Sequence, residues 1–159
     1  LNTQSKLFTS SSTCFGAQPN SQANEIDLAL PGTLPRLNKE ALRKAIRLGL
    51  ALNAHINNPT SFDRKHYFYP DLPCGYQITQ QREPIAHSGY IDFIVYDDFH
   101  HKIGLQHPSE KILPRIQRCH IKQIQLEQDS GKSLIDIDES YIDLNRAGIA
   151  LLEFVFEPV

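Results

Sequence analysis

Apolar residues recur every three to four positions between residues 38 and 53, a spacing that predicts an amphipathic helix. Asn38 is suited to cap its first turn, and Glu40 is favourable near its N-terminal end. The apolar face comprises Leu42, Ala45, Ile46, Gly49, Leu50 and Leu52. The opposite face is expected to be solvated or to dock RNA or a partner, because it carries Lys39, Arg43, Lys44 and Arg47.

Elsewhere apolar and polar residues alternate with a period of two, which predicts strands. The strands are expected over residues 90–96, 116–126 and 149–156, with a shorter one over 26–30. The polar stretches are expected to be connections, namely a loop over 9–36 and a hairpin-like segment over 97–109. Since no βαβ alternation is present, we predict an α+β fold with a mostly antiparallel sheet and flanking helices.

Composition narrows the class of protein. The 159 residues suit one domain, and 40% hydrophobic with 21% charged residues is ordinary for a globular chain. A net charge of −2 excludes a global basic field, so contact with nucleic acid requires local patches. No apolar run approaches the roughly 20 residues of a membrane-spanning helix. A disulfide framework is unexpected, because only three well-separated cysteines occur, Cys14, Cys74 and Cys119.

The stretch over residues 62–78, FDRKHYFYPDLPCGYQI, combines cations, carboxylates, three tyrosines and turn residues. Loops with such residues commonly carry function, and this one is suited to hold an anion. Arg64 can clamp a phosphate with two hydrogen bonds, while Lys65 offers a point charge. Tyr67, Tyr69 and Tyr76 are candidates to line a nucleotide site or to wall a conduit for ammonia. The alternative is a surface ion pair above packed tyrosines.

This stretch resembles a hallmark motif of the B subunit of glutamyl-tRNA(Gln) amidotransferases. Three further motifs are similar to that family and follow in the same order. They are NTQSKLF (residues 2–8) with LPGTLP (30–35), LEQDSGK (126–132), and DLNRAG (143–148) leading into LLE (151–153). The resemblance therefore spans nearly the whole chain.

The resemblance implies a fold and a domain organisation. The family's catalytic cradle is related to glutamine synthetase, so an incomplete glutamine-synthetase-like domain is expected. Residues 1–159 are then part of a single N-terminal kinase and transamidase domain. Members usually open with a strand reading G-L-E-x-H-V before the position of Asn2. We therefore expect the first strand and the C-terminal remainder of the domain to be missing from this chain.

The resemblance also implies a carbon–nitrogen ligase that uses ATP and Mg²⁺. Glutamate on misacylated tRNA(Gln) is activated by ATP and then amidated with ammonia from glutamine. Partners would be the amidase (A) subunit, the small (C) subunit and tRNA(Gln). Departures from the bacterial pattern suggest a mitochondrial matrix protein, with the bacterial cytoplasm as the alternative. The departures are Cys74 for Lys, Gln128 for Glu, Ala150 for Pro, and Asn24 and Asp27 where some members carry zinc-type cysteines.

Glu153 is the most unusual carboxylate of the sequence. Its neighbours in ALLEFVF (150–156) are apolar on both sides, so we predict that it is buried and needs a partner. One interpretation is a structural ion pair with a cation such as Arg146. The other, favoured by the resemblance, is that Glu153 is a metal ligand.

Glu127 ends the preceding strand, on the predicted face with Gln123 and Gln125 rather than with Ile124 and Leu126. Carboxylates of neighbouring strands can converge on one cation, so Glu127 is a second candidate ligand. The resemblance adds Gln128, as a neutral oxygen donor. Alternation turns Glu127 and Gln128 to opposite faces unless the strand bulges. The alternative is a solvated strand end.

Two further cations are candidates for the site. Lys132 follows Ser130-Gly131 but lacks a complete phosphate-loop motif, so it is only a candidate nucleotide contact. Arg146, in the turn after Asp143, is a candidate clamp for phosphate or carboxylate. The histidines of the polar connection, His100, His101 and His107, are expected to be solvated. A non-catalytic scaffold that binds tRNA and partner proteins is the alternative function.

Overall fold

The computed structural model describes residues 1–95 and 114–158. Its main sheet has four antiparallel strands in the order β1 (His55–Ile56), β4 (Ala86–Val95), β5 (Arg115–Gln128) and β8 (Ala150–Phe156). Two hairpins accompany it, β2 (Asp63–His66) with β3 (Tyr76–Thr79), and β6 (Lys132–Ile135) with β7 (Ser140–Asp143). The helix among the described residues is α1 (Lys39–Ala51). The mostly antiparallel α+β prediction is confirmed, although within residues 1–95 and 114–158 one helix, not several, flanks the sheet.

Helix α1 forms where the apolar period predicts it. The Asn38 side chain accepts hydrogen bonds from the backbone N–H groups of Glu40 and Ala41, at 2.9 and 3.4 Å. The helix packs very closely on the sheet at Gly49. A Cβ there would lie 2.7 Å from Ile56 Cδ1 and 3.2 Å from Ala86 Cβ. A side chain at this position would therefore require the Ile56 side chain to shift and would crowd Ala86.

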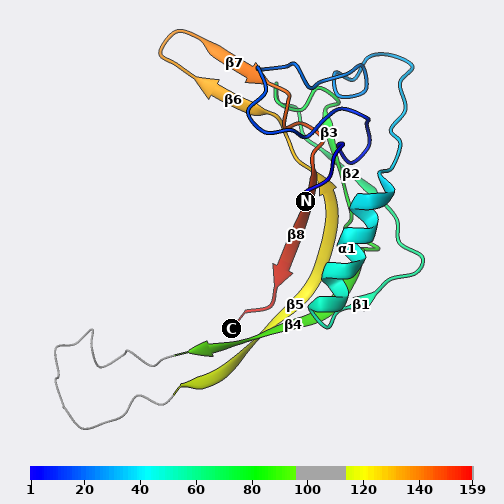
Figure 1. The fold of residues 1–159 in the computed structure, drawn as a ribbon, viewed down its shortest axis with the longest axis vertical. Coiled ribbons are helices and arrows are strands. Elements are labelled where there is room, and N and C mark those ends of the chain that lie inside the picture. Colours follow the sequence, from blue (N-terminus) through cyan, green and yellow to red (C-terminus); the bar gives the residue numbers. More distant parts are fainter. Residues whose placement is uncertain (96–113, 159) are drawn as a thin grey trace, which may run out of the picture.

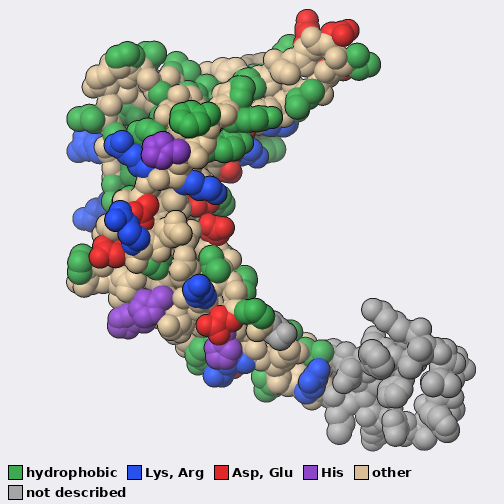
Figure 2. Space-filling model, turned by 180° about the vertical axis from the view of Figure 1, so that it is seen from behind, with side chains coloured by type: hydrophobic (Ala, Val, Ile, Leu, Met, Phe, Trp, Pro, Cys, Tyr) green, Lys and Arg blue, Asp and Glu red, His purple; other side chains and the backbone are tan. Residues whose placement is uncertain are grey.

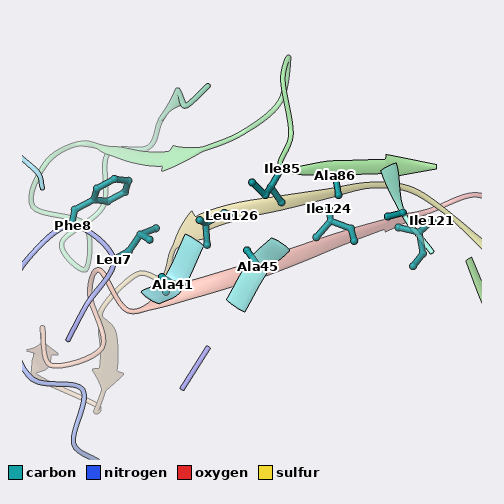
Figure 3. Packing of buried hydrophobic residues seen from close by; sticks show 11 residues of the cluster. Leu7, Phe8, Ala41, Ala45, Ile85, Ala86, Ile121, Ile124 and Leu126 are labelled. Atoms are coloured by element: carbon teal, nitrogen blue, oxygen red, sulfur yellow. The ribbon is translucent and has the colours of Figure 1, made fainter. Parts of the chain in front are cut away.

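The core lies between α1 and one face of the sheet (Figure 3). Ile124 and Leu126 of β5 are fully buried against this helix, as alternation predicts. Burial of an aliphatic side chain of this size stabilises a fold by about 1.5–3 kcal/mol. The other fully or nearly fully buried apolar residues of the cluster include Leu7, Ala41, Ala45, Ile85, Ala86, Ile121 and Ala150.

The long strands give the molecule a curved shape. In Figure 1, α1 lies on the convex side of β5, and the β6–β7 hairpin projects from one end of the curve. Figure 2 shows the hollow on the other side, with acidic side chains at its inner edge. The described part of the chain has no helix with the length and apolar character needed to cross a membrane.

Three predictions of local structure need correction. The strand expected over 26–30 is wrong, because these residues form turns in which Ala29 has a φ of 56°. The stretch over 62–78 is not all loop, since β2 and β3 pair across residues 67–75. The strands expected over 90–96 and 116–126 are confirmed but are longer. The connection expected over 97–109, with His100, His101 and His107, lies outside the described residues.

Candidate functional site

Three polar side chains share the face of the sheet that α1 does not cover. In the β5–β8 ladder, Gln125 pairs with Glu153 and Glu127 pairs with Leu151. Paired residues of antiparallel strands, and residues two apart on one strand, point to the same side. Gln125, Glu127 and Glu153 therefore form one polar group on the concave side of the curved sheet. We call this group the acidic face.

Glu127 is the buried carboxylate of the acidic face, with 7% of its surface exposed. The Thr79 hydroxyl of β3 donates a hydrogen bond to its Oε2 at 2.8 Å. Burial raises the pKa of Glu127, and the charge of Glu153 raises it further. Thr79, Lys65 and Gln77 oppose this rise in the pKa. The charges of Glu127 and Glu153 repel each other, and a cation bound between them would relieve this repulsion.

Glu153 is exposed, so the prediction that it is buried is wrong. Its apolar neighbours Leu152 and Phe154 turn toward α1 and the core, whereas Glu153 points to the opposite, uncovered face. The alternative of an ion pair with Arg146 is not found: within residues 1–95 and 114–158, Arg146 pairs with Asp129 at 3.6 Å. The role of Glu153 as a metal ligand stays a prediction.

Gln128 lies on the other side of the sheet from the two glutamates. It pairs with Ala150, and the ladder is regular from Gln123 to Gln128, because the irregularity of β5 falls between Ile121 and Gln123. No bulge therefore turns Gln128 toward Glu153. In the described segments no group of three His, Cys, Asp or Glu side chains is arranged to hold a metal ion. Of the three predicted ligands, Glu127 and Glu153 share one face of the sheet.

The β2–β3 hairpin separates the two candidate cations that are adjacent in sequence. Lys65 pairs with Gln77 in the β2–β3 ladder, so its side chain lies on the same face as Thr79. Its positive charge acts on the nearby Glu127 and opposes the rise in the pKa of that carboxyl. Arg64 points to the other face, where its guanidinium lies 4.7 Å from the ring centre of Tyr76. The structure therefore brings Lys65, but not Arg64, to the acidic face.

The three candidate tyrosines, Tyr67, Tyr69 and Tyr76, do not lie together in the structure. Tyr67 and Tyr69 lie in the loop after β2, are exposed, and stack with ring centres 5.7 Å apart. Burial and the nearby charge of Asp71 raise the pKa of Tyr67. Tyr76, by contrast, contributes to a pocket on the Gln128 side of β5.

Arg146 and Lys132 lie away from the acidic face. Arg146 Nε donates to Ser130 O at 2.9 Å, and Arg146 Nη2 donates to Gly131 O at 2.6 Å. Through these hydrogen bonds and its ion pair with Asp129, the Arg146 guanidinium is bound to the turn that follows β5. Lys132 opens β6, opposite Asp143, and is exposed. Their predicted phosphate contacts stay predictions, and the observed contacts of Arg146 are structural.

The pocket encloses about 240 Å³ between segments that are distant in the sequence. Its polar lining includes Thr9, Asp27, Cys74, Tyr76 and Gln128. Asp27 is neutralised by the buried amine of Lys6 at 3.2 Å. Burial raises the pKa of the Cys74 thiol, which makes it a poor nucleophile at neutral pH. The lining is thus largely uncharged, and it lies on the opposite side of β5 from the glutamates.

Sequence reasoning missed Thr79, Gln77 and Gln125 around Glu127. Alternation places Gln125 on the correct face, but gives it no role. Thr79 and Gln77 follow the aromatic stretch in an alternating sequence, Tyr76–Thr79, that indicates a strand. No pattern in the sequence indicates that this strand contacts the end of β5.

Known proteins match this chain over its whole length. A family model described as "GatB/GatE catalytic domain" matches residues 1–159. The chain is 52% identical over 160 residues to the B subunit of the human mitochondrial glutamyl-tRNA(Gln) amidotransferase, covering 99% of the chain and 27% of the relative. It is 54% identical over 160 residues to the B subunit of the aspartyl/glutamyl-tRNA(Asn/Gln) amidotransferase of Vesicomyosocius okutanii, covering 99% and 30%. The corresponding protein from Granulibacter bethesdensis is 51% identical over 157 residues, covering 98% and 29%. The chain thus spans less than a third of the length of these relatives.

Proposed function

The chain belongs to the GatB/GatE catalytic domain family, and on that premise we propose that it is part of the catalytic domain of a tRNA-dependent amidotransferase. Residues 1–159 would contribute to a single glutamine-synthetase-like N-terminal domain of the B subunit. The relatives' names support an amidotransferase acting on aminoacyl-tRNA in translation. The proposed partners are the amidase (A) subunit, the small (C) subunit and tRNA(Gln).

The proposed reaction has two steps. First, a γ-carboxylate oxygen of glutamate on tRNA(Gln) attacks the γ-phosphorus of ATP, which forms an acyl phosphate and releases ADP. Ammonia then attacks the acyl carbon, inorganic phosphate leaves, and a proton is lost to give glutaminyl-tRNA(Gln). Both steps concentrate negative charge on phosphate oxygens, so the site needs fixed positive charge.

The observation that carries this proposal is the buried Glu127 beside Glu153 on the acidic face. Their oxygens are of the type that Mg²⁺ prefers, and their mutual repulsion favours a bound cation. Bound Mg²⁺ would neutralise the phosphates of ATP. Lys65 lies on the same side and offers a further positive charge for a phosphate or carboxylate. Gln128 faces away and is not part of this donor set.

We also propose that the pocket beside Cys74 and Gln128 is one segment of the path that ammonia follows. Because the pocket lies on the opposite side of β5 from the acidic face, this path would continue past the sheet to the acyl phosphate. Ammonia must reach the acyl phosphate without loss to solvent, which requires a sealed and partly polar path. The largely uncharged lining, with Tyr76 at its wall, suits a small neutral molecule. We assign Tyr76 to this path, whereas Tyr67 and Tyr69 lie in the exposed loop before it.

Glu153→Gln in the full-length complex tests the proposal by ATP-dependent amidation of glutamyl-tRNA(Gln). Loss of a carboxylate that holds the cation is expected to lower kcat by about 10²-fold or more. Glu157→Gln, which removes an exposed carboxylate just beyond β8, is the matched control and is expected to leave turnover unchanged. Unchanged turnover of Glu153→Gln, with normal complex assembly, would remove Glu153 from the proposed metal site, whereas a chain that binds neither Mg²⁺ nor ATP would support the non-catalytic scaffold.

The proposed location is the mitochondrial matrix. It rests on the departures from the bacterial pattern at Cys74, Gln128 and Ala150. Fluorescence microscopy of the tagged full-length protein in its own cells, with a matrix marker, tests this proposal. A bacterial source would place the protein in the cytoplasm.

A further inference from the structure

We propose that Thr79 is a positioning residue, which holds the Glu127 carboxylate in place so that it binds a divalent cation together with Glu153. This inference rests on the function proposed above. It adds a residue that touches neither substrate nor cation and that acts through Glu127.

The contact between the two side chains is short and buried. Thr79 is 6% exposed and Glu127 is 7% exposed. The Thr79 hydroxyl oxygen lies 2.8 Å from Glu127 Oε2, whereas its distance to Gln125 Oε1 is 3.5 Å. A hydroxyl has one proton to donate, and the charged, closer oxygen is the stronger acceptor. The hydrogen bond therefore belongs to Glu127.

Two sets of contacts fix the position of this hydroxyl, the pairing of β3 with β2 and the hydrogen bonds of the next residue, Gln80. Thr79 pairs with Asp63 in the β2–β3 ladder. The next residue, Gln80, is fully buried, and its Oε1 accepts hydrogen bonds from Ile85 N at 3.1 Å and Leu126 N at 2.9 Å. The Gln80 amide thus ties the end of β3 to the residue that precedes Glu127 in β5.

A carboxylate that accepts a hydrogen bond from a fixed donor loses rotational freedom, and the Gln77 side chain also contacts Glu127. Glu153 lies on the same face, across the β5–β8 ladder. Without the Thr79 hydroxyl, Glu127 Oε2 would lose this donor in a buried position, and the carboxylate would be held less firmly, by Gln77 and Lys65. Residues that orient metal ligands in this way typically contribute about 10–100-fold to metal affinity.

Binding of Mn²⁺ to the full-length protein in its complex tests the inference without relying on turnover. Mn²⁺ replaces Mg²⁺ as the probe, and electron paramagnetic resonance measures the free ion. Thr79→Val, which keeps the shape but removes the hydroxyl, is expected to weaken Mn²⁺ binding by about 10–100-fold. Thr79→Ser restores the hydroxyl and is expected to bind within a few-fold of the wild type. Kinetically, Thr79→Val is expected to raise the Mg²⁺ concentration needed for half-maximal rate more than it lowers the rate at saturating Mg²⁺.

Controls separate this inference from the function on which it rests. Thr33→Val removes a hydroxyl that donates to Leu30 O at 2.8 Å in the loop before α1, and is expected to leave Mn²⁺ binding unchanged. If Glu127→Gln loses Mn²⁺ binding but Thr79→Val retains it, Thr79 does not position the ligand. If Glu127→Gln itself binds normally, the proposed cation site is wrong. Should Thr79→Val fail to fold, Thr79→Ala takes its place, and equal binding by the Ala and Ser variants would overturn the inference.

Discussion

The buried ion pair between Lys6 and Asp27 holds two loops against the end of the sheet. Neither side chain has appreciable solvent exposure, and Lys6 Nζ lies 3.2 Å from Asp27 Oδ2. Burial lowers the pKa of Lys6, and the charge of Asp27 opposes that effect. Lys6 Nζ also donates to Leu144 O at 3.1 Å, while Ser11 Oγ and Asn24 N donate to Asp27. The pair thereby connects the N-terminal segment with the turn before β8.

Lys6→Met is expected to be strongly destabilising, because it leaves the Asp27 carboxylate buried without its cation. Removal of one partner of such a pair typically costs about 3–5 kcal/mol in the free energy of unfolding. Urea unfolding followed by circular dichroism measures the change. Adding Asp27→Asn to the Lys6→Met variant should recover part of the loss. Arg43→Met is the control, since the Arg43–Glu40 pair is exposed and such pairs contribute little to stability. A Lys6→Met cost no larger than that of the control would contradict the argument.

The β2–β3 hairpin is tied to the turn that follows it through Asp63. Asp63 Oδ2 accepts hydrogen bonds from Gln81 N at 3.0 Å and Arg82 N at 3.1 Å, and Oδ1 accepts from Arg82 Nε at 2.7 Å. The two backbone N–H groups, and then the Arg82 guanidinium, lower the pKa of Asp63 to about 2. This hairpin carries Lys65 and Thr79, so its anchorage matters for the acidic face.

The low pKa of Asp63 predicts a pH dependence of stability. The folded-state pKa lies below the reference value of 3.8, so the contribution is complete above that pH and is lost as the pH falls toward about 2. Asp63→Asn should therefore lower the melting temperature most at neutral pH, with the difference shrinking between about pH 4 and pH 2. Thermal melts over this range measure it. Asp138→Asn, in the exposed turn of the β6–β7 hairpin, controls for the loss of one charge. A constant difference at every pH would show that the ionised form of Asp63 has no special role.

Elements with a strong period were predictable, whereas elements made by distant contacts were not. The helix over 39–51 and the strands β4, β5 and β8 follow from apolar spacing alone. The predicted strand over 26–30 failed because Asn24 and Asp27 form side-chain hydrogen bonds to backbone N–H groups that favour a turn. Strands β2 and β3 were not predicted, because residues 62–78 are of types that are common in loops.

The arrangement of the acidic face required the packed molecule. Alternation correctly separated Glu127 from Gln128, since it depends only on the strand. Burial of Glu127 and exposure of Glu153 depend on β3 crossing the end of β5 and on α1 covering the other face. The apolar neighbours of Glu153 therefore misled the sequence argument. They mark the core side of β8, and the glutamate lies on the opposite side.

The pocket joins parts of the chain that are distant in the sequence. It is lined by the N-terminal loops, the loop before β3, the end of β5 and the turn before β8, including Phe8, Asp27, Cys74, Gln128 and Gly148. Gly148 has a φ of 85°, and a Cβ there would lie 3.2 Å from Asp27 Oδ1. Cys74 and Gln128, where the resemblance implies Lys and Glu in other members, both line this cavity.

The two departures are expected to compensate each other, because together they remove one positive and one negative charge from the same enclosed space. Cys74→Lys or Gln128→Glu alone would place a charge in a poorly solvated pocket, which is unfavourable without a partner. The double variant can form an ion pair across the cavity. We expect a coupling free energy of about 0.5–3 kcal/mol between the two substitutions in urea unfolding. Gln18→Glu, on an exposed side chain, is the matched control for Gln128→Glu and should show no coupling with Cys74→Lys. If the two pocket substitutions are simply additive, their side chains do not interact across the cavity, and the two departures do not compensate each other.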